Sequence, residues 1–236
     1  KRNIRFQDSQ GRITWWREQR FVSMANPRLA AISLELTPEN WSGEITLRSG
    51  LDGNVRNEGV ARYRGLESQH LDHLGTRQMD DDLIALQVRT RQSRIEIAMV
   101  ARHVLYQDGH PIHPEPRLDA DHAQIFLHYP LTLQQDQPLR IEKTIALHSS
   151  RDLAITEPLT AAEAAIVRAA PFEELLDEHQ QAWKQLWEEC DIKVEAPQND
   201  DANMKLRLHI FHLLQTVSLH SIDQDVSVPA RGWHGE

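Results

Sequence analysis

The densest group of side chains suited to binding a sugar lies at the end of the chain, in the loop 223–236. This loop leaves a predicted helix through Pro229 and then presents Arg231, Trp233, His234 and Glu236 close together. These side chains offer hydrogen-bond donors, a flat aromatic face and a carboxylate acceptor, which is the set that a carbohydrate site uses. The four residues are our candidates for a substrate-pocket loop. A solvated connection that binds no ligand fits the same pattern equally well.

Histidine pairs with i,i+3 spacing are the next candidates, because on a helix this spacing can bring two imidazoles to one metal ion. No cysteine or carboxylate nearby completes a recognisable ligand set, and the first two pairs are expected in loops. We therefore predict no metal site and interpret the histidines as surface or packing residues. The pairs are His70 with His73, His110 with His113, and His209 with His212.

Three further groups could do chemistry but have simpler structural interpretations. The run Asp80 to Asp82 could hold a hard cation, yet it lacks the other acidic positions of an EF-hand loop and is expected to be a solvated turn. Trp15 and Trp16 would point to opposite faces of a strand, so one is expected in the core and the other at a domain interface. Cys190 lies on a helical stripe and is expected to be an inert packing thiol.

The elements that position these residues change type near residue 155. Up to about residue 157, apolar residues recur at every second position, as in Ala30-Ile32-Leu34-Leu36, and turn signals such as Asp52-Gly53-Asn54 separate these runs. This pattern predicts an antiparallel β-sandwich. Beyond residue 155 the period becomes helical, and the capping-box spacing of Thr160 and Glu163 predicts a helix start at Thr160.

Two longer helices are expected after that point. The first should run from about Pro171 to Cys190, with its apolar residues and His179 on one stripe. Trp183 and Trp187, one helical turn apart, are expected to pack against the sandwich or a barrel. The second should run from about Ala202 to Leu219 and is apolar around most of its circumference. A helix of that kind is normally buried on most sides, so we expect other protein to cover it.

Composition excludes several classes of function. The 236 residues carry a formal net charge of −9 and no basic run, which argues against nucleic acid and anionic membranes as partners. No apolar run approaches the roughly 20 residues of a membrane span. The single cysteine rules out an internal disulfide and predicts a cytoplasmic location.

Several stretches together resemble glycoside hydrolase family 65, the inverting phosphorylases of maltose, trehalose and kojibiose and some hydrolases. The resemblance covers nearly the whole chain in the family's order, and its most specific pieces are NWSG, SGLDGNV, HLLQT and PARGWHGE. It implies a supersandwich like that of galactose mutarotase, a helical linker and the start of an (α/α)6 barrel. The implied domains are 1–157, incomplete at its start, then 158–198 and 199–236.

The same resemblance sets the functional expectations. The whole protein would act on an α-linked disaccharide without a cofactor, taking inorganic phosphate as co-substrate if it is a phosphorylase. The general acid is expected beyond Glu236, so no catalytic residue is assigned and the chain alone should be structural. The alternative is a non-catalytic β-sandwich module that binds carbohydrate or protein. The sequence leaves a homodimer open.

Overall fold

The computed structural model describes residues 1–56, 68–153, 155–195 and 201–216. Two compact units divide the chain, Lys1–Leu176 and Asp177–Glu236. The described part of the first unit contains eleven strands, and every described strand pairing is antiparallel. The strands are β1 (Arg2–Gln7), β2 (Ile13–Val22), β3 (Leu29–Pro38), β4 (Gly43–Asp52), β5 (Leu71–Asp80), β6 (Leu83–Thr90), β7 (Glu96–Gln107), β8 (His110–Ile112), β9 (Arg117–Ala120), β10 (Gln124–Leu133) and β11 (Leu139–Ser149).

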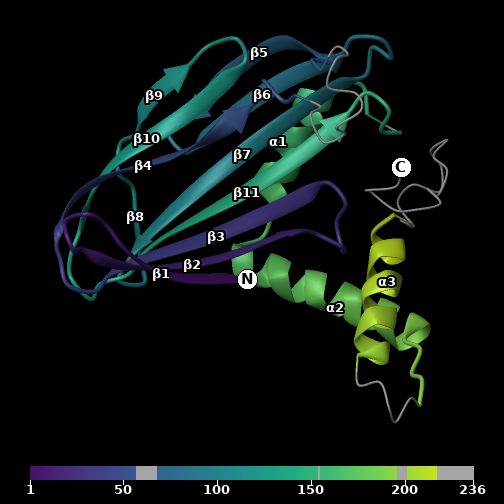
Figure 1. Cartoon of the computed structure of the whole chain (residues 1–236). Helices are drawn as coiled ribbons and strands as arrows, with labels where there is room; N and C mark the ends of the chain where they lie inside the picture. Colours follow the sequence, from purple (N-terminus) through teal and green to yellow (C-terminus); the bar gives the residue numbers. More distant parts are fainter. Residues whose placement is uncertain (57–67, 154, 196–200, 217–236) are drawn as a thin grey trace. The chain divides into compact units, whose positions relative to one another are not determined.

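The strands form two sheets that face each other (Figure 1). The larger sheet has the order β1-β2-β3-β11-β7-β6-β5, with β8 beside β7, and the smaller has the order β4-β10-β9. The core between them contains residues from both sheets, including Ile84, Leu127 and Leu139, each 1% exposed or less. The predicted antiparallel sandwich is confirmed. His110 and His113 were expected in a loop, but His110 begins β8, a short strand that pairs with the end of β7.

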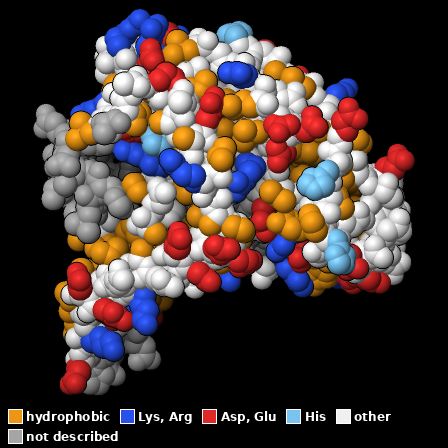
Figure 2. Space-filling view, turned by 180° about the vertical axis from the view of Figure 1, so that it is seen from behind, with side chains coloured by type: hydrophobic (Ala, Val, Ile, Leu, Met, Phe, Trp, Pro, Cys, Tyr) orange, Lys and Arg blue, Asp and Glu red, His pale blue; other side chains and the backbone are white. Residues whose placement is uncertain are grey.

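The outer face of the larger sheet carries helix α1 (Pro158–Arg168), which lies behind β7 and β11 in Figure 1. Under the helix the sheet presents small side chains, so the helix can approach closely and bury Ala162 and Ile166 completely. Figure 2 shows the molecule from that side, where acidic and basic side chains are interspersed and hydrophobic ones reach the surface between them. The small residues in this second core cluster are Ala31, Ala85, Val100 and Ala146.

Helix α1 starts earlier than the capping-box spacing predicts. Its N-cap is Glu157, whose carboxylate accepts hydrogen bonds from the backbone N–H groups of Leu159, at 2.9 Å, and Thr160. Pro158 occupies the first turn, where its missing N–H leaves no donor unpaired and its fixed φ favours the helix. The prediction of a start at Thr160 was therefore wrong by two residues, because the pair Glu157-Pro158 supplies a cap and a starter together.

The corner between α1 and α2 (Phe172–Cys190) rests on two charged side chains of the larger sheet. Arg102 on β7 donates to the carbonyl oxygens of Ile166 and Ala169 at the end of α1, both at 3.0 Å. Glu142 on β11 accepts a hydrogen bond from the backbone N–H of Phe172 at the start of α2. A cation thus meets the negative end of one helix and an anion meets the positive end of the next.

Replacing Arg102 by Met is expected to destabilise the first unit by about 2 kcal/mol, because two helix-end carbonyls lose a charged donor. Urea unfolding followed by circular dichroism measures this difference. The matched control is Arg168→Met, which removes an exposed arginine from α1 itself and should change stability by less than about 0.5 kcal/mol. Equal effects of the two substitutions would show that Arg102 does not clamp the helix end.

The second unit contains most of α2 together with α3 (Ala202–Thr216). Trp183 stacks on Trp187, with ring centroids 6.3 Å apart, and packs against Phe211 of α3 at 5.1 Å. The two tryptophans were expected to anchor α2 on the sandwich or a barrel, whereas the described contact of Trp183 is with α3. Leu208 and Leu213 are each 51% exposed, so α3 is covered on only part of its circumference. The predicted end of this helix at Leu219 lies outside the described residues.

Candidate functional site

The four candidates for a substrate-pocket loop, Arg231, Trp233, His234 and Glu236, lie outside the described residues. Their assignment to a sugar pocket stays a prediction. The same holds for the predicted domain boundaries at 157/158 and 198/199. The cavities described below lie within the first unit.

The histidine pairs do not form a metal centre in the described residues, where no group of three His, Cys, Asp or Glu side chains is placed to hold a metal ion. His73 was expected in a loop but lies on β5, with Nε2 3.1 Å from the carbonyl oxygen of Gly53 and its ring 5.5 Å from that of His122. His209 and His212 are both exposed on α3. The interpretation of these histidines as surface or packing residues stays a prediction.

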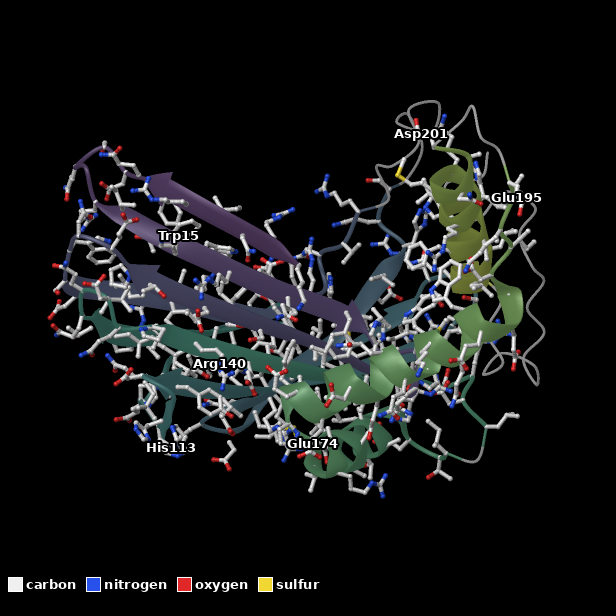
Figure 3. The ribbon with its side chains drawn as sticks, turned by 90° about the horizontal axis from the view of Figure 1, so that it is seen from below. Trp15, His113, Arg140, Glu174, Glu195 and Asp201 are labelled. Carbon is white, nitrogen blue, oxygen red and sulfur yellow. The ribbon has the colours of Figure 1, made fainter. Side chains whose placement is uncertain are left out.

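The tryptophan pair on β2 lies outside the core. Trp15, labelled in Figure 3, is 37% exposed, and Trp16 is half-buried, so neither belongs to the core. The expectation that one of them is a core residue was wrong, because this part of β2 lies beyond the area that the smaller sheet covers. Cys190 is half-buried and free.

A pocket of about 300 Å³ lies at the α1–α2 corner, and its polar groups are already engaged with one another. The Arg140 guanidinium, labelled in Figure 3, stacks over the ring of Tyr106 at 4.4 Å and lies 3.4 Å from the carboxylate of Glu142. Tyr106 donates to the same carboxylate at 3.4 Å. Burial raises the pKa of Glu142 despite these partners. We therefore interpret the polar side chains around this pocket as structural, because they hold the α1–α2 corner in place.

The most distinctive feature with binding potential is an acidic cavity of about 280 Å³ in the first unit. Its lining includes Asp80, Asp81 and Asp82 from the β5–β6 turn, His103 on β7, and Tyr129 on β10. Asp80 and Asp81 are exposed, Asp82 is half-buried, and Tyr129 is 1% exposed. The turn is held against β7 because the backbone N–H of His103 donates to the carbonyl oxygen of Asp82 at 2.9 Å.

The polar groups of the acidic cavity are mainly hydrogen-bond acceptors in a negatively charged environment. Burial and the neighbouring charge of Asp80 raise the pKa of the Asp82 carboxyl. Burial, reinforced by the charges of Asp82 and Asp81, raises the pKa of the Tyr129 hydroxyl, which has no hydrogen-bond partner among the described residues. An unpaired buried hydroxyl is unfavourable, and such groups are uncommon in folded proteins.

Two basic side chains, His103 in the lining of the acidic cavity and the half-buried Lys143, are paired on the neighbouring strands β7 and β11. His103 Nε2 lies 2.9 Å from the Ser49 hydroxyl, and Nδ1 lies 3.2 Å from the carbonyl oxygen of Asp82. Burial, reinforced by the charge of Lys143, lowers the pKa of His103 to about 3, so the ring is neutral at pH 7. Burial lowers the pKa of Lys143 to about 8, and its ammonium donates to the carbonyl oxygen of Gly50.

Sequence reasoning missed Tyr129, His103 and Lys143. Lys143 follows Leu139 and Ile141 in an alternating strand, and a lysine at such an inward position is a sequence signal of a buried charge. The Asp80–Asp82 turn was found, and its solvated character is confirmed for Asp80 and Asp81. Its contact with Tyr129 could not be found, because the two are distant in sequence.

No helix in the described ranges is long and apolar enough to cross a membrane.

Comparison with known proteins gives a match over most of the chain. The family model described as glycosyl hydrolase family 65, N-terminal domain, matches residues 1–186. An uncharacterized glycosyl hydrolase of Mycobacterium tuberculosis is 38% identical over 235 residues, covering 100% of this chain and 18% of the relative. The kojibiose phosphorylase of Halothermothrix orenii is 30% identical over 246 residues, covering 100% of this chain and 30% of the relative.

A trehalose 6-phosphate phosphorylase of Lactococcus lactis is 27% identical over 84% of this chain and 24% of its own length. The fold also matches a solved structure from the human microbiome, provisionally called a kojibiose phosphorylase, with a TM-score of 0.73 and 15% identity. That match covers 91% of this chain and 26% of the other. The chain thus spans less than a third of the length of each of these relatives.

Proposed function

Since the chain belongs to glycosyl hydrolase family 65, whose N-terminal domain it carries over residues 1–186, we propose that it is the non-catalytic front part of an enzyme that cleaves α-linked disaccharides of glucose. The observation that supports this most is the alignment of the whole chain with a kojibiose phosphorylase that is 30% identical to it. Relatives named for trehalose 6-phosphate, trehalose and nigerose widen the candidate substrates to α-glucosides as a class.

The proposed reaction inverts the anomeric centre. A carboxylic acid protonates the glycosidic oxygen while phosphate, or activated water in a hydrolase, attacks the opposite face of the sugar. Phosphorolysis of an α-glucoside would then release β-glucose 1-phosphate. We propose phosphorolysis over hydrolysis because several of the relatives are named phosphorylases.

The sandwich and its helices would support this chemistry without taking part in it. In this proposal the general acid lies outside this chain, and the acidic cavity and the pocket at the α1–α2 corner both lie within the sandwich unit. In this proposal α3 begins the catalytic barrel, whose other helices cover the exposed Leu208 and Leu213. The loop carrying Arg231, Trp233, His234 and Glu236 would face the sugar pocket from that helix.

The complete protein that contains this chain is expected to release β-glucose 1-phosphate from at least one of kojibiose, trehalose, nigerose and maltose when phosphate is present. Proton and phosphorus NMR identify the anomer and its dependence on phosphate. The 236-residue chain alone should give no turnover above background, because the general acid is expected outside it.

Release of glucose without phosphate would favour a hydrolase and contradict the phosphorolysis proposal. Turnover by the purified chain alone would contradict the structural role assigned to it. Absence of any action on all four sugars by a folded complete protein would overturn the substrate class.

A further inference from the structure

The acidic cavity presents three carboxylates, none of which forms a salt bridge within the described part of the chain, although the charges of Arg102 and His113 act on Asp82. The carboxylates of Asp80 and Asp81 are exposed at its edge, that of Asp82 is half-buried, and the Tyr129 hydroxyl is enclosed without a hydrogen-bond partner in the described part of the chain. The Tyr129 side chain is 1% exposed and faces the negative charges of Asp81 and Asp82. The buried hydroxyl is an observation independent of the acidic turn.

Several ligand classes fit this lining poorly. Anions are repelled by three carboxylates. A metal ion requires several ligands at short range, and in the described residues no three His, Cys, Asp or Glu side chains are placed for one. A neutral polyol offers donors, but it leaves the repulsion between the carboxylates in place. A cavity of about 280 Å³ also exceeds what a single ion fills.

An organic ammonium group can neutralise the carboxylates and can also donate a hydrogen bond to the Tyr129 hydroxyl, since it carries a positive charge and up to three N–H donors. Part of the lining is apolar and comes from Leu105 on β7 and Ile112 on β8, which gives an alkyl body a place to pack. His113, labelled in Figure 3, lies beyond β8 on the same lining and is exposed. The lining therefore combines a charged edge, an apolar wall and a hydroxyl at the buried end.

We propose that the acidic cavity binds a small organic ammonium compound, with its nitrogen between Asp81 and Asp82 and one N–H donated to the Tyr129 hydroxyl. The alkyl part packs on Leu105 and Ile112. This site is separate from the disaccharide chemistry proposed above and does not depend on it.

Isothermal titration calorimetry of the folded 236-residue chain with n-butylammonium chloride tests the proposal. One saturable site with a dissociation constant in the millimolar range or tighter is expected. Butan-1-ol, which has the same alkyl body without the charge, should not bind. Tyr129→Phe removes one hydroxyl and should weaken butylammonium binding about tenfold or more, and Asp82→Asn should do the same.

Tyr129→Phe separates ligand binding from a structural role. Because the hydroxyl has no hydrogen-bond partner among the residues that the structure describes, its removal should leave the midpoint of thermal unfolding unchanged or higher while binding falls. The charge control is Asp177→Asn on α2, an exposed carboxylate that does not line the cavity, and it should leave binding unchanged.

The proposal is overturned if butylammonium shows no saturable binding, or if butan-1-ol binds as tightly as butylammonium. It is also overturned if Asp177→Asn weakens binding as much as Asp82→Asn does. Stronger binding of calcium chloride or of glucose, lost in the Tyr129→Phe variant, would assign the cavity to a metal ion or a polyol instead.

Discussion

Acidification from pH 6.5 to about pH 3 is expected to remove as much as about 5 kcal/mol of folding stability through a single side chain, His103. The folded pKa of His103, about 3, lies below the ordinary value of 6.5. Between these two values the unfolded chain binds a proton that the folded chain does not, so stability falls as the pH falls. The physical cause is the burial of the ring between Ser49 and the carbonyl oxygen of Asp82.

Urea unfolding at pH 7 and pH 4 measures this loss. His103→Gln cannot titrate in this range and should flatten the dependence of stability on pH, although its stability at pH 7 is lower because the hydrogen bond geometry changes. His110→Gln, at an exposed position on β8, should leave the dependence as it is. A wild-type protein and a His103→Gln variant with the same slope between pH 4 and pH 6.5 would contradict the assignment.

The second large effect concerns Lys143 and occurs in the alkaline range instead of the acidic range. Its folded pKa of about 8 lies below the ordinary 10.5, so between pH 8 and pH 10.5 the unfolded chain binds more protons than the folded chain. Stability from this group therefore rises with pH across that window, by as much as about 3 kcal/mol. At pH 7 the enclosed ammonium has one described hydrogen bond, to the carbonyl oxygen of Gly50, and remains costly to bury.

Lys143→Met keeps a side chain of similar length and removes the charge. We expect the variant to be more stable than the wild type at pH 7, with an advantage that shrinks as the pH rises to 10. Chemical unfolding of both proteins at several pH values gives this difference directly. Lys184→Met, at an exposed site on α2, should show no such trend. A constant difference between Lys143→Met and wild type at all pH values would mean that folding does not lower the pKa of Lys143.

The sequence predicted the secondary structure well because the evidence for it is local. The alternating residues of β3 and β11 and the helical stripe of α2 depend on neighbours a few positions away. The start of α1 was misplaced because two competing caps, Glu157 and Thr160, stand three residues apart and both have the correct chemistry. The capping chemistry alone does not decide between these two residues, whereas Pro158, which directly follows Glu157, favours the earlier start.

The acidic cavity could not be predicted, because it is made by pairing across the sandwich. Asp82 and Tyr129 are 47 positions apart in the numbering, and nothing in either segment indicates the other. Even so, polar residues at inward strand positions, such as His103 and Lys143, are readable signals of a buried polar group. The predicted sugar loop remains a prediction, because Arg231 to Glu236 lie outside the described residues.

Arg102 and Glu142, which hold the α1–α2 corner, limit where homologues can gain or lose residues. Arg102 and Glu142 lie on adjacent strands, where Arg102 is opposite Thr144 and Glu142 is opposite Val104. The sheet thus fixes the spacing between the two charges, and the segment Ala169–Pro171 must bridge the end of one helix and the start of the next across that fixed span. An inserted or deleted residue there would separate Phe172 from Glu142 or Ala169 from Arg102. Insertions should therefore accumulate in the strand turns, while this connection keeps a constant length among homologues that retain both charges.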